Sequence, residues 1–361
     1  MRALLADARG APTSRLFHRF VRRCNTRACM AGTLSGRSSY LNLNAILMTH
    51  DEVGQLADVT SVLASVFRKA GRVVAAQPDL LAAYGFPWAF AELVRQDVDL
   101  PTLYGRFDFI LDTSGVWKVV EYNSDTPSGI RETAVVDEIA FGFLAGRFAG
   151  ARVNHLFAPA LARAFAAALP RRRSSVTIGF VVDTDHMEDR GAVACQVRIL
   201  ENQWQDARIR TVFGDLDNLT QRRDGGMALC GQPIDALYRC FAFEALYNQP
   251  QLFWLMDSLD RGKIVLLNRP RGLLLQNKGL MAWIWAHRDD TLFTALEQEA
   301  ITRHVPPTWW IADYPGRETS GPVLVKQVFG REGEEVYYGD AMTDVDWANC
   351  RRWATFVVQE L

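Results

Sequence analysis

The sequence predicts a mixed α/β fold, and three observations support that prediction. Residues 176–182 form a continuous apolar strand, as in the middle of a parallel sheet, and a helical pattern at 193–203 and a strand at 209–213 follow it. Residues 106–122 alternate polar and apolar side chains on both sides of a turn, the pattern of an antiparallel hairpin. Hydrophobic residues make up 49% of the 361 positions, enough for a core divided among one to three domains.

The composition excludes several classes of protein. The formal net charge of −1 gives no reason to expect nucleic-acid binding, and no run of 18 apolar residues predicts a membrane span. The six histidines show no HExxH or HxxxH spacing, which argues against a zinc site. The six cysteines include no CxxC pair, and they predict reduced thiols and a cytoplasmic location.

Lysine is rare in this chain. Of the 40 basic residues, five are lysine and 35 are arginine, so arginine supplies the general positive charge. Each lysine is therefore a stronger pointer to function than usual. The five are Lys69, Lys118, Lys263, Lys278 and Lys326.

The first 39 residues carry eight arginines and one acidic residue. This composition mimics an organelle transit peptide, but no cleavable apolar segment follows it. We therefore favour a disordered or loosely attached extension, or a start codon assigned too early. A weak helical pattern is also present in Leu16, Phe17, Phe20 and Val21.

Two helical regions are expected before the hairpin. Residues 40–70 are mostly helical and carry an apolar stripe at helical spacing, with Gly71 as a plausible stop. Residues 80–94 form a second region, interrupted at 85–87. We interpret the stripe as a core face and not as a cofactor motif. Its members are Val59, Val62, Leu63, Val66 and Phe67.

The hairpin gathers polar groups on one face. A turn at 112–115 lets Leu111 pair with Val116, which sets Arg106 opposite Glu121. Because side chains alternate along a strand, one face then carries an arginine, two carboxylates and an amide. These are Arg106, Asp108, Glu121 and Asn123.

Two readings of this polar face are open, a solvated outer face and a binding site. Residues 122–129 directly follow the polar face and add further oxygen ligands; their sequence is YNSDTPSG. A helix that begins after Ser128 or Gly129 would leave free backbone N–H groups nearby. Carboxylate and amide oxygens beside an arginine are what a magnesium–phosphate site requires. We therefore favour the binding site.

The middle of the chain predicts a small α/β domain. Helices are expected at 130–148 and 159–169, and the basic run at 171–173 is expected to be a solvated turn. The loop at 183–190 follows the apolar strand at its carboxyl end, where ligands of α/β sheets tend to lie. The GxGxxG motif is missing, so a dinucleotide fold is not predicted.

The elements continue to alternate up to residue 304. Strands are expected at 234–239 and 264–267, and helices at 246–259, 273–285 and 292–304.

The last part of the chain combines a strand, a lysine and a glycine-containing turn. Lys326 ends the strand at 323–326, and glycines occur in the turn at 327–336. An ammonium group beside accessible backbone N–H groups can hold a phosphate, although an ordinary hairpin is the other reading. Residues 356–361 are expected to form a buried strand.

Four stretches resemble the ATP-dependent ligase half of the glutathionylspermidine synthases, which are permuted ATP-grasp carboxylate–amine ligases. The resemblance runs from about Tyr40 to Leu361, and its specific part is the Glu-Tyr-Asn-x-Asp-Thr-Pro string with RxD before it. The stretches are RFDF at 106–109, EYNSDTPSG at 121–129, LLLQNKGL at 273–280 and VKQVFGREGEEV at 325–336.

The resemblance implies an ATP-grasp-like synthetase with a pre-ATP-grasp α/β domain. The C-terminal lobe is expected to be incomplete, because relatives continue beyond the strand at 356–361 with further strands and another arginine. The expected divisions are an extension at 1–39, a helical region with the hairpin at 40–150, the small α/β domain at 151–262, and the nucleotide-binding region at 263–361.

The implied reaction joins a carboxylate to an amine with ATP and Mg²⁺, through an acyl phosphate, and releases ADP and phosphate. Arg106 would be catalytic by stabilising the transferred phosphoryl group. The implied Mg²⁺ ligands are Asp108, Glu121 and Asn123. The implied ATP-binding residues are Lys278 and Lys326 at the phosphates, Gly330 and Gly333 in a lid loop, and Gln359 and Glu360 beside the adenine.

One residue departs from the family pattern. Gln327 stands where the relatives have proline after the lysine, which should loosen the turn that follows Lys326.

Weaker candidates for substrate contact are Ser124, Thr126, Ser128 and Glu244. For Glu244, a helix N-terminal acid that complements the dipole is an equal alternative. The acid and the amine are not predicted, and neither a nucleic-acid nor a membrane partner is expected. The alternative function is an inactive or fragmentary ATP-grasp relative that binds nucleotide or a partner without turnover.

Overall fold

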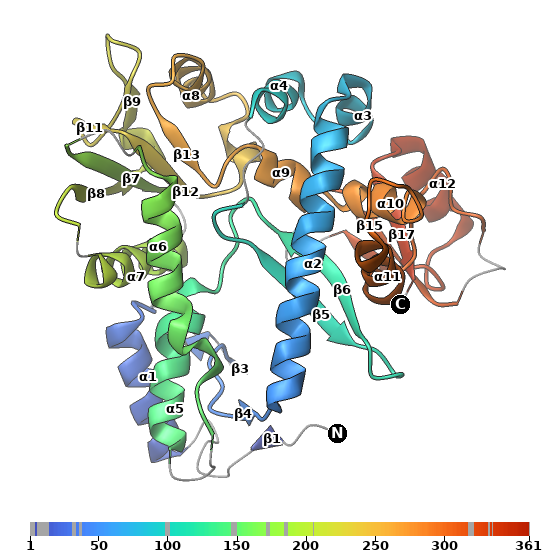
Figure 1. The fold of residues 1–361 in the computed structure, drawn as a ribbon, viewed down its shortest axis with the longest axis horizontal. Coiled ribbons are helices and arrows are strands. Elements are labelled where there is room, and N and C mark those ends of the chain that lie inside the picture. Colours follow the sequence, from blue (N-terminus) through green and yellow to red (C-terminus); the bar gives the residue numbers. More distant parts are fainter. Residues whose placement is uncertain are drawn as a thin grey trace. The chain divides into compact units, whose positions relative to one another are not determined.

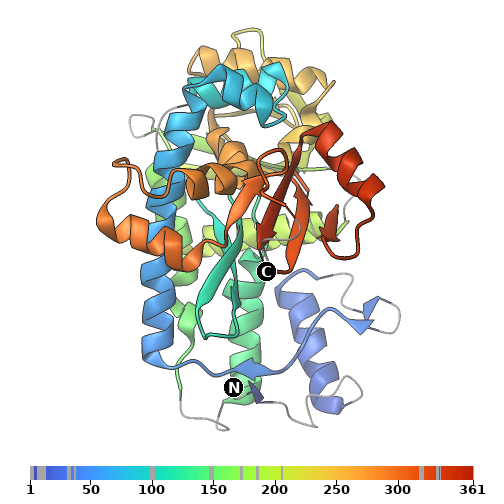
Figure 2. The same cartoon turned by 90° about the vertical axis from the view of Figure 1, so that its right-hand side faces the viewer.

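The computed structural model forms two compact units, each built from two separate stretches of chain (Figures 1 and 2). Unit 1 comprises Met1–Val53 and Ser128–Asn268, and unit 2 comprises Gly54–Pro127 and Arg269–Leu361. This division differs from the four consecutive segments expected from the sequence. The residues that the structure describes are 4–5, 14–30, 34–35, 38–97, 102–145, 150–170, 174–183, 187–204, 206–316, 321–330, 333 and 335–360.

Unit 1 contains a parallel four-stranded sheet in the order β13–β12–β7–β8, which confirms the predicted mixed α/β class. The middle strands are nearly continuous apolar runs because both faces of a parallel sheet are covered. The strands are β7 (Val176–Val182), β8 (Ile209–Asp215), β12 (Ala236–Cys240) and β13 (Val265–Leu267). The helices beside them in sequence are α6 (Phe157–Ala168), α7 (Met187–Gln203) and α8 (Pro250–Asp260).

The sequence pattern does not reveal a small antiparallel sheet in the same unit. Its order is β11–β10–β9, and each strand has only three residues, too few for alternation to be recognised. The strands are β9 (Leu219–Gln221), β10 (Met227–Leu229) and β11 (Gln232–Ile234). Two-stranded pairs join β1 (Leu4–Leu5) to β4 (Ala45–Ile46) and β2 (Leu34–Ser35) to β3 (Ser38–Ser39).

The N-terminal segment contains a packed helix. Helix α1 (Arg15–Arg27) starts at Ser14, whose side chain accepts a hydrogen bond from the Phe17 backbone N–H at 3.0 Å. One face of this helix is buried, so the expected disordered or loosely attached extension is corrected for residues 15–27. The apolar stripe makes this segment a packed helix, and the arginines occupy the other faces of that helix. The buried residues are Phe17, Phe20, Val21 and Cys24.

The helix expected at 130–148 is shorter among the described residues. It includes a π-helical turn at Glu132–Val136 and α5 (Asp137–Leu144). Residues 146–149 lie outside the part of the chain that the structure describes. The basic run at 171–173 and residues 184–186 of the expected ligand loop also lie outside it.

Unit 2 carries the hairpin, the second sheet and most of the remaining helices. The predicted helix at 273–285 is interrupted at Asn277, whose side chain accepts a hydrogen bond from the Gly279 N–H at 2.9 Å and caps a new helix. The helices are α2 (His50–Ala75), α3 (Pro78–Ala83), α4 (Trp88–Gln96), α9 (Arg271–Gln276), α10 (Lys278–Ala286), α11 (Ala295–His304) and α12 (Asp344–Trp353).

The register of the hairpin, β5 (Arg106–Leu111) and β6 (Trp117–Asn123), differs from the expected one. Arg106 pairs with Asn123 and not with Glu121, and Asp108 pairs with Glu121. The turn has a three-residue loop with Gly115 at φ +83°, and a bulge between Asp108 and Phe109 shifts the pairing again. The sequence period cannot show either irregularity.

The apolar face of the hairpin explains how it is held. The rings of Phe107 and Tyr122 stack with centroids 4.0 Å apart, and Phe67 of α2 meets both edge-on at 5.4 and 5.3 Å. The stripe predicted on α2 is therefore the core face against which the hairpin packs. Since side chains alternate, the polar set of β5 and β6 lies on the opposite face.

The second sheet is antiparallel in the order β14–β17–β15–β16. Leu324 pairs with Gln359, and Lys326 pairs with Val357, so Lys326 and Gln359 share one face as diagonal neighbours. The strands are β14 (Thr308–Trp310), β15 (Val323–Gln327), β16 (Val336–Tyr338) and β17 (Phe356–Glu360).

A buried carboxylate links α11 to α2 in unit 2. Glu297 accepts hydrogen bonds from Lys69 at 2.6 Å and Ser65 at 2.8 Å, and it also completes a capping box with Thr294. Burial raises the pKa of Glu297, but these donors outweigh it and the pKa falls from 4.5 to about 2.

We expect Glu297→Gln to lower the free energy of unfolding by about 2–3 kcal/mol at pH 7. A depressed carboxyl pKa stabilises the fold above the unfolded value of 4.5, and this stabilisation is lost as the pH falls through about 2. Urea unfolding of both proteins from pH 7 down to pH 2 checks both points. Glu299→Gln is the matched control because Glu299 is exposed on the same helix. Equal losses in the two variants would contradict the assignment.

Candidate active site

A cavity of about 450 Å³ lies within unit 2, lined by the hairpin, the start of α10 and the second sheet. Seven of the predicted site residues line this cavity, namely Glu121, Lys278, Lys326, Gly330, Gly333, Gln359 and Glu360. The full lining is Ile110, Asp112, Lys118, Val120, Glu121, Lys278, Pro306, Pro307, Leu324, Lys326, Gly330, Gly333, Val336, Gln359 and Glu360.

The polar face of the hairpin forms one hydrogen-bonded network. Arg106 donates to both oxygens of Asp108, from Nε at 2.6 Å and from a terminal nitrogen at 2.9 Å. The Asn123 amide donates to Asp108 at 3.3 Å and to Glu121 at 3.0 Å. The hydrogen bonds with Asp108 raise the pKa of Arg106, so this guanidinium is firmly charged and held in place. The four predicted residues are thus brought together in spite of the different register.

Lys278 is fixed by the break between α9 and α10. Its backbone N–H donates to the Val328 carbonyl at 3.0 Å, which ties the start of α10 to the end of β15. Its Nζ donates to the Gly330 carbonyl at 2.6 Å and lies 3.6 Å from Glu121. Lys278 therefore connects the carboxylate face of the hairpin to the loop that follows β15.

Lys326 is a buried cation of the cavity with a lowered pKa. It is buried, and its Nζ donates to the Gln359 side-chain oxygen at 2.5 Å. Burial and the neighbouring charge of Lys278 lower the pKa of Lys326 from 10.5 to about 8. Gln359 in turn donates to Thr308 at 3.2 Å, and Thr308 donates to the Pro306 carbonyl at 2.8 Å.

The loop after β15 has a defined start. The Gln327 side chain accepts a hydrogen bond from the Phe329 N–H at 2.8 Å. The backbone carbonyl of Gln327 accepts a second one from the Gly330 N–H at 3.1 Å. Gln327 therefore closes the turn that its difference from proline was expected to loosen. Gly333 has φ +82°, a left-handed conformation that favours glycine. Residues 331, 332 and 334 lie outside the described part.

The weaker substrate candidates do not join this cavity. Ser124 is fully buried, and its hydroxyl donates to the Gly272 carbonyl at 2.7 Å, so it holds α9 against the end of β6. Thr126 is half-buried in unit 2 and does not line the cavity. Ser128 and Glu244 belong to unit 1, where Glu244 lies in a short 3₁₀ turn at Phe243–Leu246.

Eight lining residues carried no site prediction, and Pro306 and Pro307 are two of them. The Pro307 carbonyl accepts a hydrogen bond from the Glu360 N–H at 3.0 Å. Thr308 is not a lining residue, but its hydroxyl accepts a hydrogen bond from Gln359 at 3.2 Å and so positions that side chain. The proline pair is visible in the sequence only as the end of α11. Its adjacency to Glu360 arises from the pairing of β14 with β17, which connects residues about fifty positions apart.

The hairpin offers a donor set that fits magnesium in its chemistry. Asp108 and Glu121 supply carboxylate oxygens from directly paired positions, and Asn123 supplies an amide beside them. Among the described residues, no group of three or more acidic, histidine or cysteine side chains could hold a metal ion. The set therefore consists of two carboxylates and one amide.

A sequence model of the glutathionylspermidine synthase preATP-grasp family matches residues 27–361. The chain belongs to this family. Among solved structures, it is similar to a glutathione synthetase-like effector from Globodera pallida in its apo form, with a TM-score of 0.59 and 13% identity. The match covers 88% of this chain and 73% of that one, and at this identity it shows the fold alone.

Membership of the glutathionylspermidine synthase preATP-grasp family confirms the resemblance noted from the sequence motifs. The family relates the chain to synthetases, that is, to ligases that in general bind ATP and act on small molecules. No helix within the described ranges is both long enough and apolar enough to cross a bilayer.

Proposed function

We propose that this chain is an ATP-dependent carboxylate–amine ligase that forms an amide through an acyl phosphate. The observation that carries the proposal is the convergence of Lys278 and Lys326 with Glu121 in one cavity of unit 2. The chain has only five lysines, and three of them, Lys118, Lys278 and Lys326, line this cavity. The Lys118 ammonium donates to the Arg303 carbonyl, while Lys278 and Lys326 come from separate elements and lie beside the polar groups of the site. Two ammonium groups beside carboxylate and amide oxygens match the charge pattern of a bound magnesium nucleotide.

The two lysines would bind the nucleotide phosphates. In the structure their ammonium groups are held by the Gly330 carbonyl and the Gln359 side chain, so both are already oriented into the cavity wall. Phosphate oxygens are stronger acceptors than these neutral groups and would compete for the same protons. Glu360 would flank the adenine, with Leu324 and Val336 as apolar neighbours in the lining.

Asp108, Glu121 and Asn123 would hold Mg²⁺, which when bound neutralises charge on the phosphate oxygens. Arg106 would stabilise the phosphoryl group during transfer and then the acyl phosphate. Its orientation is already set by Asp108, so it would not need to reorganise when the charge develops. Gly330 and Gly333 would let the loop backbone approach the nucleotide.

A location in a reducing compartment such as the cytoplasm belongs to the same proposal. It is supported by the six cysteines, all of which are unpaired in the structure and all of which lie in its described part.

The reaction is tested by ADP release in a screen of carboxylic acids and amines. Each acid–amine pair is incubated with Mg²⁺ and ATP. A coupled enzymatic assay measures ADP release, and mass spectrometry identifies the product. We expect ADP release to require both an acid and an amine and to produce their amide. Binding of ATP without ADP release for any pair would favour the alternative of a relative that does not turn over.

The pKa of Lys326 predicts a pH dependence. In the free protein Lys326 is charged below its pKa of about 8 and neutral above it. If its ammonium binds phosphate, ATP affinity should fall as the pH rises through 8, by up to about tenfold per pH unit. Calorimetry from pH 7.5 to 9.5 measures this, well above the phosphate pKa of about 6. Lys326→Arg should give a flatter profile, and a flat profile in the unmodified protein would contradict the assignment.

A further inference from the structure

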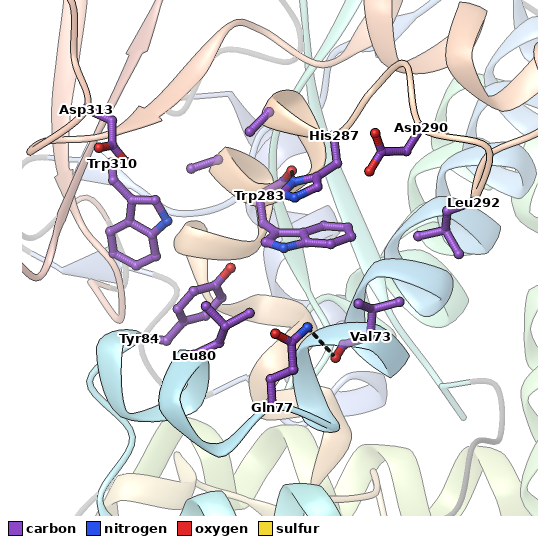
Figure 3. A pocket seen from close by; sticks show the side chains of 12 residues that line it. Val73, Gln77, Leu80, Tyr84, Trp283, His287, Asp290, Leu292, Trp310 and Asp313 are labelled. Atoms are coloured by element: carbon purple, nitrogen blue, oxygen red, sulfur yellow. Dashed lines mark hydrogen bonds between the residues drawn. The ribbon is translucent and has the colours of Figure 1, made fainter.

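Unit 2 contains a second cavity, of about 590 Å³, that shares no lining residue with the candidate active site (Figure 3). It is lined by α2, α3, the C-terminal half of α10, β14 and the segments that follow them. The twelve lining residues are Val73, Gln77, Leu80, Tyr84, Ala282, Trp283, Ala286, His287, Asp290, Leu292, Trp310 and Asp313.

Aromatic rings form its walls. Trp283 stacks on His287 with centroids 4.0 Å apart and planes 15° apart, and this pair is further fixed because His287 Nδ1 lies 2.8 Å from the Trp283 carbonyl oxygen. Trp310 lies against Tyr84 with centroids 4.9 Å apart. Both indoles are half-buried, so part of each face remains open to a ligand.

Two aspartates, Asp290 and Asp313, are among the residues that line the cavity. Asp290 and Asp313 are exposed at its rim, and none of the twelve described lining residues is lysine or arginine. Figure 3 shows the two carboxylates on opposite sides of Trp283. The Gln77 amide nitrogen donates to the Val73 carbonyl at 3.3 Å. Carboxylates beside open indole faces attract a cation and repel an anion.

A buried hydroxyl without a partner points into the same space. Tyr84 is 2% exposed, and its hydroxyl has no hydrogen-bond partner in the described part of the protein. In Figure 3 this hydroxyl points toward the space between Trp310 and Trp283. Buried polar groups of folded proteins usually find partners, so an orphaned hydroxyl at a cavity wall points to a ligand that supplies one.

We propose that this cavity binds a small organic cation that carries a guanidinium group. A planar guanidinium can stack on an indole and donate N–H groups to the Tyr84 oxygen, while the two carboxylates at the rim favour its positive charge. The same unit already uses this contact, because the Arg288 guanidinium lies 4.7 Å from the Trp285 ring and that of Arg351 lies 5.6 Å from the Trp347 ring. The site is independent of the proposed ligase reaction.

The test uses phenylguanidine and its neutral isostere phenylurea as probes, with affinity measured by calorimetry on the full chain. Phenylguanidine should bind at least about tenfold more tightly than phenylurea, because only the cation gains from the carboxylates. The double variant Asp290→Asn/Asp313→Asn should remove this preference. Both positions are exposed, so the fold should be retained, and circular dichroism confirms it.

Asp289→Asn is the matched control, because Asp289 adjoins Asp290, is 82% exposed and does not line the cavity. It should leave the affinity for phenylguanidine unchanged. Tyr84→Phe should weaken the binding of phenylguanidine more than the binding of phenylurea. It should not lower the melting temperature of the protein, because it removes a buried hydroxyl that has no hydrogen-bond partner in the described part of the structure. Equal binding of the two probes, or a preference that survives the double variant, would overturn the proposal.

Discussion

Replacing Glu121 with glutamine is expected to abolish turnover, lowering the rate of ADP release by about three orders of magnitude. The substitution keeps the size of the side chain and its hydrogen bond with Asn123 but removes one of the two carboxylate charges. Glu121 is also the group that connects the hairpin network to Lys278, at 3.6 Å. Without that charge, the proposed Mg²⁺ site loses the ligand that lies beside Lys278, the proposed phosphate-binding residue.

Two measurements make this expectation specific. With an acid–amine pair found in the screen, ADP release reports turnover, and calorimetry with and without Mg²⁺ reports how strongly the ion assists ATP binding. We expect Glu121→Gln to lose both turnover and the effect of Mg²⁺, while Glu299→Gln, an exposed substitution in the same unit, retains both. An active Glu121→Gln enzyme would remove the basis for the metal assignment.

Lys278→Ala is expected to weaken ATP binding by about two orders of magnitude. The Lys278 ammonium is buried beside Glu121 and the Gly330 carbonyl, so the phosphates would gain a charge-assisted hydrogen bond in a partly desolvated place. The start of α10 should survive the substitution, because its cap depends on the side chain of Asn277. The loss should therefore appear in binding and not in the helix.

Lys263→Ala is the control for this variant. Lys263 is another of the five lysines, but it is exposed in unit 1, so its removal changes the net charge equally without touching the cavity. Calorimetric titration with Mg²⁺ and ATP should give an unchanged affinity for Lys263→Ala. If both variants weaken ATP binding equally, the effect comes from the overall charge of the protein, and Lys278 does not contact the nucleotide.

The shared polar face of the hairpin could be predicted from the sequence, but its pairing could not. Alternation alone places Arg106 and Asp108 on one side of β5, and this holds in the structure. The pairing depends on a three-residue loop at Gly115 and on the bulge after Asp108, which are properties of backbone geometry.

The convergence of the lysines could be predicted only from the family resemblance. Lys278 and Lys326 are 48 positions apart, and no local pattern brings them together. What does so is the cap at Asn277 and the hydrogen bond from the Lys278 N–H to Val328, both visible only in three dimensions. The two-unit arrangement could not be predicted for the same reason, because each unit joins two stretches that are separated by more than 70 residues of the other unit.

The N-terminal helix shows a different limit. Its apolar stripe is present in the sequence, but the eight arginines of the first 39 residues favoured disorder. The structure buries Phe17 and Phe20 and leaves the arginine heads outside, so the spacing of a few large apolar residues outweighs a high local charge.

The most direct test of the account is calorimetric titration of this chain with ATP, in the presence and in the absence of Mg²⁺. We predict saturable binding of one nucleotide per chain that requires Mg²⁺ for full affinity. No binding by a sample shown to be folded would contradict the proposed nucleotide site, and binding indifferent to Mg²⁺ would contradict the role given to Asp108, Glu121 and Asn123.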